Sequence, residues 1–533
     1  MILSIALKDF YNNLVSARFI IGFILCILII PVILIVSIND YKSQVQAYEV
    51  ERTRAEERDQ IRVYSAFRPD TVKQPEPLSI FCKGISQNVG NRVRILFGEK
   101  PLLSAGRSSV RENPHMNAFF TIDFISVIAI LLSLLALLFT YDTCSGEKEE
   151  GTFKLVFSNP VSRYKILLGK FLGVSFTIFP IILICYVLSI IIILLNSNLS
   201  FSPGDYVRII ILLVLSILYF MIFMSLGIFI STRARSSVTS IIICMFVWVT
   251  LMFIIPNLAV YAAQSFVNVR SQENLSTALG ELNREFDEKC DEYRDKIRTP
   301  DIWFMHFNHN TGGDGFQRLV GAADKAYEFY RELNSYCEPL RVDYADRKWP
   351  VQKAYLDELE SQRILAETIS LLSPSEVFRL AASKLCKTDV DAHNRFLDTT
   401  QRYREELIQF FNDEKIFDSY EYFTPVPPEY FMTADNILQI ITGGKFNTLD
   451  EYRAWAKNSA WIFAAFTESL PDYYVSSDFY QPLDLSHVPK FNPKPLGIIG
   501  TLKQSIIKIG MLMLISIILF YLSYISFAHY DVR

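Results

Sequence analysis

Residues 141–173 read YDTCSGEKEEGTFKLVFSNPVSRYKILLGKFLG, and a strongly apolar segment lies on each side of them, 119–140 before and 171–195 after. A stretch with this many charges cannot lie in hydrocarbon, so it must form a loop at a face of the membrane. Its basic residues gather toward the second apolar segment, and an excess of lysine and arginine is typical of cytoplasmic loops. The sequence therefore predicts a membrane protein in which this loop faces the cytoplasm.

The loop has the pattern of a short amphipathic helix between two turns. Ser145 is placed to cap its start, and the glutamates that follow lie at the positive end of the helix dipole. Asn159-Pro160 ends the helix, and a second short helix over 162–170 leads into the next apolar segment. Its apolar face is suited to lie on lipid or to dock into a protein groove, although spacing alone also fits a solvated loop with an incidental interfacial helix. The residues of that face are Phe153, Val156 and Phe157, with Lys154 and Ser158 off the stripe.

The loop also carries a known motif. The run Ser145-Gly146-Glu147-Lys148-Glu149-Glu150-Gly151-Thr152 is followed by an apolar helix, Pro160, Arg163 and Gly169-Lys170. In this pattern, and in its position between two spans, the stretch resembles the first cytoplasmic loop of ABC type-2 exporter permeases. In that family the loop is the coupling helix that docks on a separate ATPase. The resemblance implies a set of residues that transmit motion from the ATPase: Glu147, Glu149, Gly151, Thr152, Phe153, Phe157, Pro160 and Arg163.

The resemblance further implies which molecules the chain works with. A cytoplasmic ABC ATPase subunit would hold ATP and magnesium, so this chain would carry no cofactor, no metal ion and no catalytic residue. The permease would pair with a second copy or a related permease as a dimer in the bacterial inner membrane, in contact with its lipid. The large outer segments look like those of permeases linked to gliding motility and nitrous-oxide-reductase maturation. An extracytoplasmic protein or lipoprotein is therefore a further expected partner.

Six apolar segments are long enough to cross a bilayer, which takes about 20 residues each. They predict a mainly α-helical membrane protein with both termini in the cytoplasm and a large, mostly helical extracytoplasmic domain. The chain divides into an amphipathic lead with the first span (1–38), a first outer segment (39–118), spans two to five with the coupling loop 141–170 (119–262), the large outer domain (263–499) and the sixth span with its cytoplasmic tail (500–533).

The large outer domain has the pattern of several helices. Leucine and aromatic residues recur at near-heptad spacing over 275–297, and we expect this helix to continue straight out of the fifth span. Ser373 and Thr448 each begin a capping pattern, with a glutamate three residues later. In the first outer segment, residues 92–97 are suited to a short strand. The further helices are expected over 316–336, 351–372, 374–385, 389–411 and 449–466.

Composition and motifs argue against several other functions. Of the 533 residues, 20% are charged and 51% hydrophobic, and the formal net charge is -4, so nothing favours a nucleic-acid partner. The sequence has no G-x-x-x-x-G-K-[ST] phosphate loop, so a nucleotide site would lie on another chain. The glycine-rich run 312–315 lacks the lysine of such a loop and predicts a turn. His306 and His309 form a short pair without further identifiable ligands, which is too little to define a metal site.

Cysteine usage leaves an alternative open. Four of the 8 cysteines fall in segments expected outside the membrane: Cys82, Cys290, Cys337 and Cys386. An even number of cysteines on the oxidising side permits two disulfides, with three possible pairings. Large domains do not need such cross-links, so four free thiols are the other interpretation.

Three functions are compatible with these features. In the first, ATP-driven closure of the ATPases pushes the coupling helices, and the spans move a substrate outward. In the second, the same machinery transmits force to the outer domain and moves no solute. In the third, the chain is a membrane-anchored receptor or enzyme without an ATPase, which leaves the loop unexplained. The predicted spans consist mainly of isoleucine, leucine and phenylalanine, without a cluster of polar residues. This composition fits a lateral or lipid-like substrate path as well as the absence of any path, so the sequence does not identify the substrate.

Overall fold

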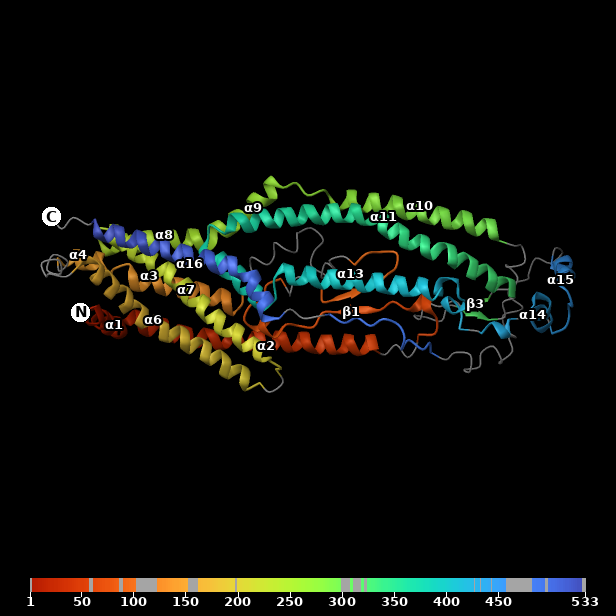
Figure 1. Ribbon diagram of the computed structural model, residues 1–533, viewed down its shortest axis with the longest axis horizontal. Coiled ribbons are helices and arrows are strands. Elements are labelled where there is room, and N and C mark those ends of the chain that lie inside the picture. The colour runs from red at the N-terminus through yellow and green to blue at the C-terminus, as the bar shows by residue number, and fades with distance from the viewer. Residues whose placement is uncertain are drawn as a thin grey trace.

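The protein is an elongated molecule, and the residues that the structure describes are mainly α-helical (Figure 1). The computed structural model describes residues 2–56, 61–85, 90–101, 122–151, 162–196, 199–298, 307–309, 318–320, 324–425, 427–431, 433–441, 443–456, 482–493 and 497–529. Within these residues, 6 helical stretches are long and apolar enough to cross a membrane: Ala17–Thr53, Phe124–Glu149, Arg163–Leu194, Pro203–Arg233, Ser237–Phe266 and Ile498–Ala528. The predicted mainly α-helical fold with six such helices is confirmed.

The apolar helices pack into one bundle, whose central member is α7. This helix contacts α3, α6, α8, α12 and α16, and it buries Leu212, Tyr219 and Phe223. Because lipid gives helices no hydrophobic reason to associate, hydrogen bonds and close packing hold them together. One such bond joins the hydroxyls of Tyr186 and Ser216 at 2.7 Å. The helices of the bundle are α1 (Ile2–Val15), α2 (Ala17–Glu56), α3 (Phe124–Thr140), α6 (Arg163–Leu194), α7 (Pro203–Arg233), α8 (Ser237–Val249), α9 (Ile255–Phe266) and α16 (Ile498–Ala528), with a π-helical turn, η5 (Thr250–Ile254), between α8 and α9.

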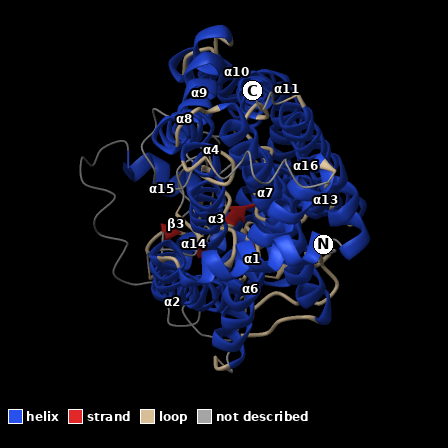
Figure 2. Ribbon diagram, turned by 90° about the vertical axis from the view of Figure 1, so that its left-hand side faces the viewer, coloured by secondary structure: helices blue, strands red, loops and turns tan. Residues whose placement is uncertain are grey.

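One end of the bundle, called the loop end from here on, gathers α1, α4 (Ser145–Glu149) and the last turns of α16 (Figures 1 and 2). From the opposite end extends a large polar domain, made of the far half of α2 and the described parts of residues 61–101 and 267–493. Helix α2 runs for 40 residues from the bundle into this domain without interruption. The two halves of the molecule are therefore joined by continuous helix as well as by packing.

The polar domain has an aromatic core. The Phe411 ring lies 5.6 Å from Tyr64, 4.8 Å from Phe97 and 5.4 Å from Phe417, between ring centroids. Its helices are α10 (Gln272–Ile297), α11 (Asp324–Ser370), α12 (Pro374–Cys386), α13 (Val390–Asp413), α14 (Ala434–Ile441) and α15 (Leu449–Ala456), and its short 3-10 turns are η2 (Tyr64–Ala66), η3 (Pro77–Ile80), η7 (Ile416–Asp418), η8 (Tyr420–Tyr422) and η9 (Pro428–Tyr430). Strand β1 (Asp70–Val72) pairs antiparallel with β2 (Arg92–Arg94), which confirms the expected strand near residue 92, and β3 (Phe307–His309) pairs antiparallel with β4 (Arg318–Val320).

The predicted helices 374–385 and 389–411 are confirmed as α12 and α13, whereas the break predicted between 336 and 351 is wrong. Helix α11 is a single element of 47 residues that contains Pro339 and Pro350. A proline inside a helix removes one hydrogen bond and bends the axis, but packing along the whole length overrides that penalty. Helix α10 provides this packing, for example through Tyr293 and Tyr336, whose rings stack at 3.9 Å.

The helix expected to continue out of the fifth span is interrupted instead. Helix α9 ends at Phe266, and α10 begins after Ser271, whose hydroxyl accepts a hydrogen bond from the Asn274 backbone N–H at 3.2 Å. Between them, Arg270 is drawn onto α11, where its guanidinium lies 2.7 Å from a Glu358 carboxylate oxygen. The same carboxylate accepts the Arg270 backbone N–H at 2.9 Å. These contacts hold the connection out of helical conformation.

The two predicted caps behave differently. Thr448 caps α15, because its hydroxyl accepts the Glu451 backbone N–H at 3.3 Å, while residues 457–466 of that expected helix lie outside the described residues. Ser373 does not cap α12; its hydroxyl donates to the Leu251 carbonyl in the π-helical turn of the bundle. A π turn leaves carbonyls available for such partners. The Ser373 hydroxyl thus joins the polar domain to the bundle. His306 and the glycine-rich run 312–315 lie outside the described residues.

Asp389, at the start of α13, gives a pH-dependent prediction. Burial raises the pKa of this carboxyl to about 6, and the nearby Asp391 carboxylate adds to the shift. A carboxyl whose pKa rises on folding stabilises the fold fully below its unfolded pKa, and that stability is lost as the pH rises through about 6. Asp389→Asn keeps a good N-cap residue and does not titrate. We expect this variant to match the parent near pH 4 and to be more stable above pH 6, by about 3 kcal/mol at most.

Thermal unfolding of the detergent-solubilised protein across pH 4 to 8 measures this difference. Asp391→Asn is the control, because the Asp391 carboxylate lies 2.9 Å from the Lys384 ammonium, and this ion pair stabilises its charged form. Its substitution should lower the melting temperature at neutral pH. Equal melting curves for Asp389→Asn and the parent above pH 6 would contradict the prediction.

Candidate functional site

The predicted coupling loop lies at the loop end of the bundle (Figure 2). Its described parts are residues 141–151, which include α4, and the start of α6 at Arg163. Glu147, Glu149, Gly151 and Arg163 are therefore placed by the structure. Thr152, Phe153, Phe157 and Pro160 lie outside the described residues, so their predicted roles stay predictions. The separate helix expected over 162–170 is wrong, because α6 is continuous from Arg163 to Leu194.

Helix α4 is a single turn that rests on the end of α7. The backbone N–H groups of Cys144 and Ser145 both donate to the Ser231 hydroxyl, at 3.0 and 3.1 Å. Ser145 itself donates its hydroxyl to the Tyr141 carbonyl at 2.7 Å and caps no helix, so the predicted cap is wrong. After Glu150 the turn ends at Gly151, whose φ of +74° is a left-handed conformation that favours glycine. Gly151 thus serves as a helix stop, which accounts for glycine at this position.

A buried ion pair fixes α4 to α6. The Lys170 ammonium lies 2.8 Å from the Glu147 carboxylate and donates to the Thr143 carbonyl at the same distance. Lys170 is only 4% exposed. A buried charge of this kind is tolerated only when its partners are well placed, and removing one partner leaves the other uncompensated. The pair therefore locks the loop to the helix that follows it.

The other side of α4 is attached to the turn between α7 and α8. The Lys148 ammonium donates to the carbonyls of Thr232 and Ala234, at 2.6 and 3.1 Å. The Glu149 carboxylate accepts the Ser237 backbone N–H at 3.1 Å, at the start of α8. A cation at the end of α7 and a carboxylate at the beginning of α8 both lie where the helix dipoles favour them. Consecutive charged residues of the motif thus bind three different helices.

Two glycines let α1 pack closely on α6 beside this site. A β-carbon on Gly173 would lie 2.8 Å from the Asp9 side chain, and one on Gly169 would lie 2.7 Å from the Ile5 side chain. The close approach buries the Asp9 carboxyl, and this burial raises its pKa while the Lys170 charge opposes the shift. One carboxyl oxygen of Asp9, Oδ2, has no hydrogen-bond partner among the described residues. The Gly169-Lys170 pair of the motif therefore combines helix packing with the buried charge.

Two further contacts tie the site to the remaining helices. The Arg163 guanidinium donates to the Ala528 carbonyl at the end of α16. Arg18, at the start of α2, lies 2.6 Å from the Asp142 carboxylate, with its guanidinium over the Tyr141 ring at 4.8 Å. Residues 141–151 and the first turns of α6 are thus connected to α1, α2, α7, α8 and α16 at one end of the bundle.

A cavity of about 440 Å³ opens beside α4. Acidic, amide and basic side chains line it, including Asp9, Asn12, Arg18, Glu147 and Glu150. Among the residues that the structure describes, no group of three or more histidine, cysteine, aspartate or glutamate side chains is arranged to hold a metal ion. Charged groups of this cavity bond to helix ends and to each other.

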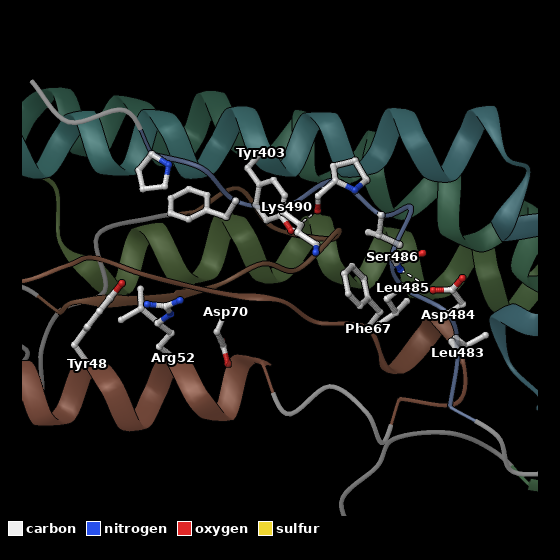
Figure 3. A pocket seen from close by; sticks show the side chains of 15 residues that line it. Tyr48, Arg52, Phe67, Asp70, Tyr403, Leu483, Asp484, Leu485, Ser486 and Lys490 are labelled. Carbon is white, nitrogen blue, oxygen red and sulfur yellow. Dashed lines mark hydrogen bonds between the residues drawn. The ribbon is translucent and has the colours of Figure 1, made fainter.

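A larger cavity of about 730 Å³ lies in the polar domain, between α2, α13 and the segment 482–493 (Figure 3). Its polar groups hold that segment in place. The Tyr403 hydroxyl donates to the Pro489 carbonyl at 2.9 Å, and the Asp484 carboxylate accepts the Ser486 backbone N–H at 2.9 Å. Asp70 is bonded to Arg92 and lies 3.2 Å from Arg94. We assign these residues to the packing of the domain.

The sequence motif named Glu147 and Glu149 as coupling residues, which stays a prediction, and it gave no role to three residues that contact α4 or its partners in the structure. Lys170 was part of the quoted motif, yet its role as partner of Glu147 depends on the way α6 folds back on α4. Ser231 and Asp9 lie on helices distant in sequence and carry no local signal. A lysine in the first turns of an apolar helix is the one sequence signal that indicates a buried partner.

Comparison with known proteins places this geometry in context. A family described as "ABC-2 family transporter protein" matches residues 3–532. A probable ABC transporter permease protein NosY from Pseudomonas aeruginosa (strain PAO1) is 48% identical over 48 residues, which is 9% of this chain and 18% of the relative. A protein of the same description from Stutzerimonas stutzeri is also 48% identical over 48 residues, 17% of its length. The similarity thus spans less than a fifth of either relative.

Proposed function

Because the chain belongs to the ABC-2 family of transporter proteins, we propose that it is a permease subunit in which residues 141–170 couple ATP hydrolysis on a separate subunit to export across the bacterial inner membrane. The substrate is open, and the apolar helices suit a lipid-like or lateral path as well as others. ATP and magnesium would bind the partner ATPase. This chain would contribute no catalytic residue and would act as the mechanical part of the complex.

The attachment of α4 to several helices is the observation that carries the proposal. Glu147 binds α6 through Lys170, Lys148 binds the end of α7, and Glu149 binds the start of α8. A force that the ATPase exerts on residues 152–161 would therefore reach three helices through hydrogen bonds of 2.6 to 3.1 Å. A solvated loop with an incidental helix would not need a buried ion pair at its root. This favours the coupling role over the interfacial alternative.

Charge distribution supports a cytoplasmic loop end. The basic residues Lys8, Arg18, Lys148, Arg163, Lys165, Lys170, Arg233 and Arg235 all belong to elements at this end. An excess of lysine and arginine in short loops marks the cytoplasmic side. We therefore propose that both termini and the coupling loop lie in the cytoplasm, and that the polar domain is extracytoplasmic.

Exposed apolar faces support partners within the membrane. In the most apolar windows of the α8–α9 stretch and of α16, only 11% of the residues are buried. Large side chains such as Phe246 and Ile507 are 70% exposed. Such faces must meet lipid or another apolar helix. We propose a dimer with a second copy or a related permease, surrounded by lipid, with one cytoplasmic ATPase below each coupling loop.

The proposal predicts that Phe157→Asp uncouples the complex. A carboxylate on the apolar stripe of the coupling segment would have to be desolvated in the groove of the ATPase, and burying an unpaired charge is strongly unfavourable. We expect at least a tenfold loss of ATPase co-purification or of permease-stimulated ATP hydrolysis in reconstituted vesicles. The amount of chain in the membrane should not change.

Ser158→Asp is the matched control, because it adds the same charge one residue later and off the predicted stripe. It should keep most of the coupling. Equal coupling in the two variants and the parent would show that this segment does not dock through its apolar face. Absence of any nucleotide-binding subunit from the purified parent would instead favour a receptor or enzyme without an ATPase.

A second function, force transmission to the polar domain without solute transport, is favoured by the joints between the two halves. Helix α2 passes from one half into the other without a break, and α12 of the polar domain packs against α7 and α16. An extracytoplasmic protein or lipoprotein would then receive the motion. Deletion of residues 434–456 separates the two functions. Two readouts are needed: stimulation of the ATPase by the shortened chain, and its ability to restore the phenotype of a strain that lacks the gene. Force transmission predicts stimulation without complementation, whereas export predicts that both are kept.

A further inference from the structure

The four cysteines outside the apolar helices lie in two neighbouring pairs. All four are free thiols in the structure, and the thiol of Cys82 lies beside that of Cys386, as the thiol of Cys290 lies beside that of Cys337. Cys386 is the last residue of α12, while Cys82 follows η3 in the segment that leaves α2. Of the three pairings that four cysteines allow, the fold brings together the members of only this one.

The backbone around the first pair is built for close approach. Gly84 has a φ of +52°, and a β-carbon there would lie 2.2 Å from the Thr388 carbonyl oxygen. The Ile85 backbone N–H donates to the same carbonyl at 3.0 Å. Only glycine allows these two segments of the backbone to run this close. Gly84 lies two residues after Cys82, and Thr388 lies two residues after Cys386, so this contact holds the two thiols side by side.

The second pair is set by the antiparallel packing of α10 on α11. Three residues after Cys290, the Tyr293 ring stacks on Tyr336 at 3.9 Å, and Tyr336 directly precedes Cys337. In the other direction, Phe286 meets Tyr344 at 5.6 Å. These contacts keep one register along the helix pair, and Cys290 and Cys337 face each other in it.

We propose that the mature protein carries two disulfides, Cys82–Cys386 and Cys290–Cys337, formed on the extracytoplasmic side of the membrane. The inference rests on the orientation given in the proposed function. In each pair, two thiols lose two protons and two electrons as the S–S bond forms. The oxidant is a protein disulfide of the cell envelope, which takes up two electrons and two protons and becomes a dithiol.

The bonds must form before folding is complete. The neighbouring Cys386 thiol, together with burial, raises the pKa of the Cys82 thiol, and burial raises the pKa of the Cys337 thiol, so the reactive thiolate is scarce once the domain has packed. In the unfolded segment, one thiolate attacks the disulfide of the oxidant to give a mixed disulfide, and the second thiolate then displaces the oxidant. Folding afterwards buries the bond.

The two bonds would stiffen different joints. Cys82–Cys386 would link the segment after α2 to α12, and α12 packs on α7 and α16 of the bundle. It therefore crosses the junction between the polar domain and the membrane helices. Cys290–Cys337 would fix the register of the α10–α11 hairpin. Both positions lie where motion of the bundle would pass into the polar domain.

The chain contains its own internal control. The thiols of Cys26 on α2 and Cys185 on α6 are also neighbours, but both lie in apolar helices of the bundle. An envelope oxidant does not reach the interior of a bilayer, so we expect these two to stay thiols. Cys144 and Cys244, also in candidate spans, should stay reduced as well.

Thiol counting on the full-length chain tests the proposal. Membranes are quenched with acid, the protein is denatured, and its thiols are alkylated with a polyethylene-glycol maleimide before or after reduction. Of the 8 cysteines, four should react without reductant and all after reduction. Reaction of all eight without reductant would overturn the proposal. In a strain without the envelope disulfide oxidant, all eight thiols should react without reductant.

Double variants test the pairing itself. Cys82→Ser with Cys386→Ser removes one whole bond, so four thiols should still react without reductant. Cys82→Ser with Cys290→Ser removes one member of each bond, so six should react. The opposite result, six for the first variant and four for the second, would show that the pairing is wrong.

Labelling of intact cells separates failure of this proposal from failure of the proposed orientation. In Cys337→Ser, the half-buried Cys290 thiol is freed, and a membrane-impermeant maleimide should reach it from outside. If all eight thiols of the parent are reduced and Cys290 is labelled, only the disulfides are wrong. If all eight are reduced and Cys290 is not labelled, the orientation fails as well.

Discussion

Lys170→Met is expected to uncouple the loop from the bundle. The substitution keeps a long side chain in place but leaves the Glu147 carboxylate without its partner and the Thr143 carbonyl without its donor. Removing one member of a buried ion pair costs about 3–5 kcal/mol, and we take the lower value because the Glu147 side chain is 22% exposed. About 3 kcal/mol corresponds to roughly a hundredfold fall in the docked population of α4.

Permease-stimulated ATP hydrolysis in reconstituted vesicles measures the effect, with co-purification of the ATPase beside it. We expect the ATPase to bind still, since residues 152–161 are unchanged, while stimulation falls by at least tenfold. Arg18→Met is the matched control. Its ion pair with Asp142 is slightly shorter, at 2.6 Å against 2.8 Å for Lys170 and Glu147, but the two side chains are 40% and 31% exposed. Exposed pairs contribute about 1 kcal/mol or less, so this variant should keep its coupling.

The double variant Glu147→Gln with Lys170→Met shows whether the charge of Glu147, once Lys170 is removed, causes the loss of ATPase stimulation. Replacing both members of a buried pair by neutral groups is far less costly than replacing one. Part of the stimulation should therefore return. If Lys170→Met were as active as the parent, the buried pair would not be the link between the loop and α6.

The architecture could be predicted from the sequence because its strongest signals, the apolar segments, are long and depend only on consecutive residues. Six apolar stretches and one charged loop follow from hydropathy alone, and the motif that begins at Ser145 indicated the family that the later comparison supported. Helices of the polar domain with clear periodicity, such as α12 and α13, were predicted within a few residues. These features depend on the nature of consecutive residues rather than on their distant partners.

The errors arose where a distant contact decides the local structure. Pro339 and Pro350 are tolerated in α11 because α10 packs alongside, and Ser373 gives its hydroxyl to Leu251 rather than to its own helix. Arg270 leaves the helix for a carboxylate on α11. In each case a tertiary interaction outweighs a local preference of about 1 kcal/mol or a helix-interior proline penalty of about 3 kcal/mol.

The same reason explains what was missed at the site. The motif named Glu147, but its partner depends on the packing of α6 against α4, and the carboxyl of Asp9 arrives on α1 from the other end of the sequence. Ser231 is one hydroxyl among many on α7. Nothing in its neighbours distinguishes it until the loop is seen to rest on it.

Gly227→Ala should force α3 and α7 apart and disturb the end of α7 on which α4 rests. A β-carbon at residue 227 would lie 1.9 Å from the Thr140 hydroxyl oxygen, which is itself held by a 2.6 Å bond to the Ala136 carbonyl. Overpacking of this kind costs about 1–3 kcal/mol. Ser231 lies one helical turn further along the same face of α7, so a shift there also strains the bonds to Cys144 and Ser145. We expect a melting temperature lower by several degrees and a weaker ATPase response.

Thr140→Ala is the designed suppressor, because it removes the atom that the new methyl group would meet. With Gly227→Ala it should restore part of the melting temperature, since the remaining contacts, at 3.0 Å from the Thr140 β-carbon and 3.2 Å from the Leu137 side chain, require shifts of only a few tenths of an ångström. Gly280→Ala is the matched control: it places the same methyl group in a helix where no atom lies within 4 Å. Alanine there should raise stability slightly, by about 0.5–1 kcal/mol. If the suppressor had no effect, the loss in Gly227→Ala would come from somewhere other than the crossing of α3 and α7, and the end of α7 on which α4 rests would not depend on that crossing.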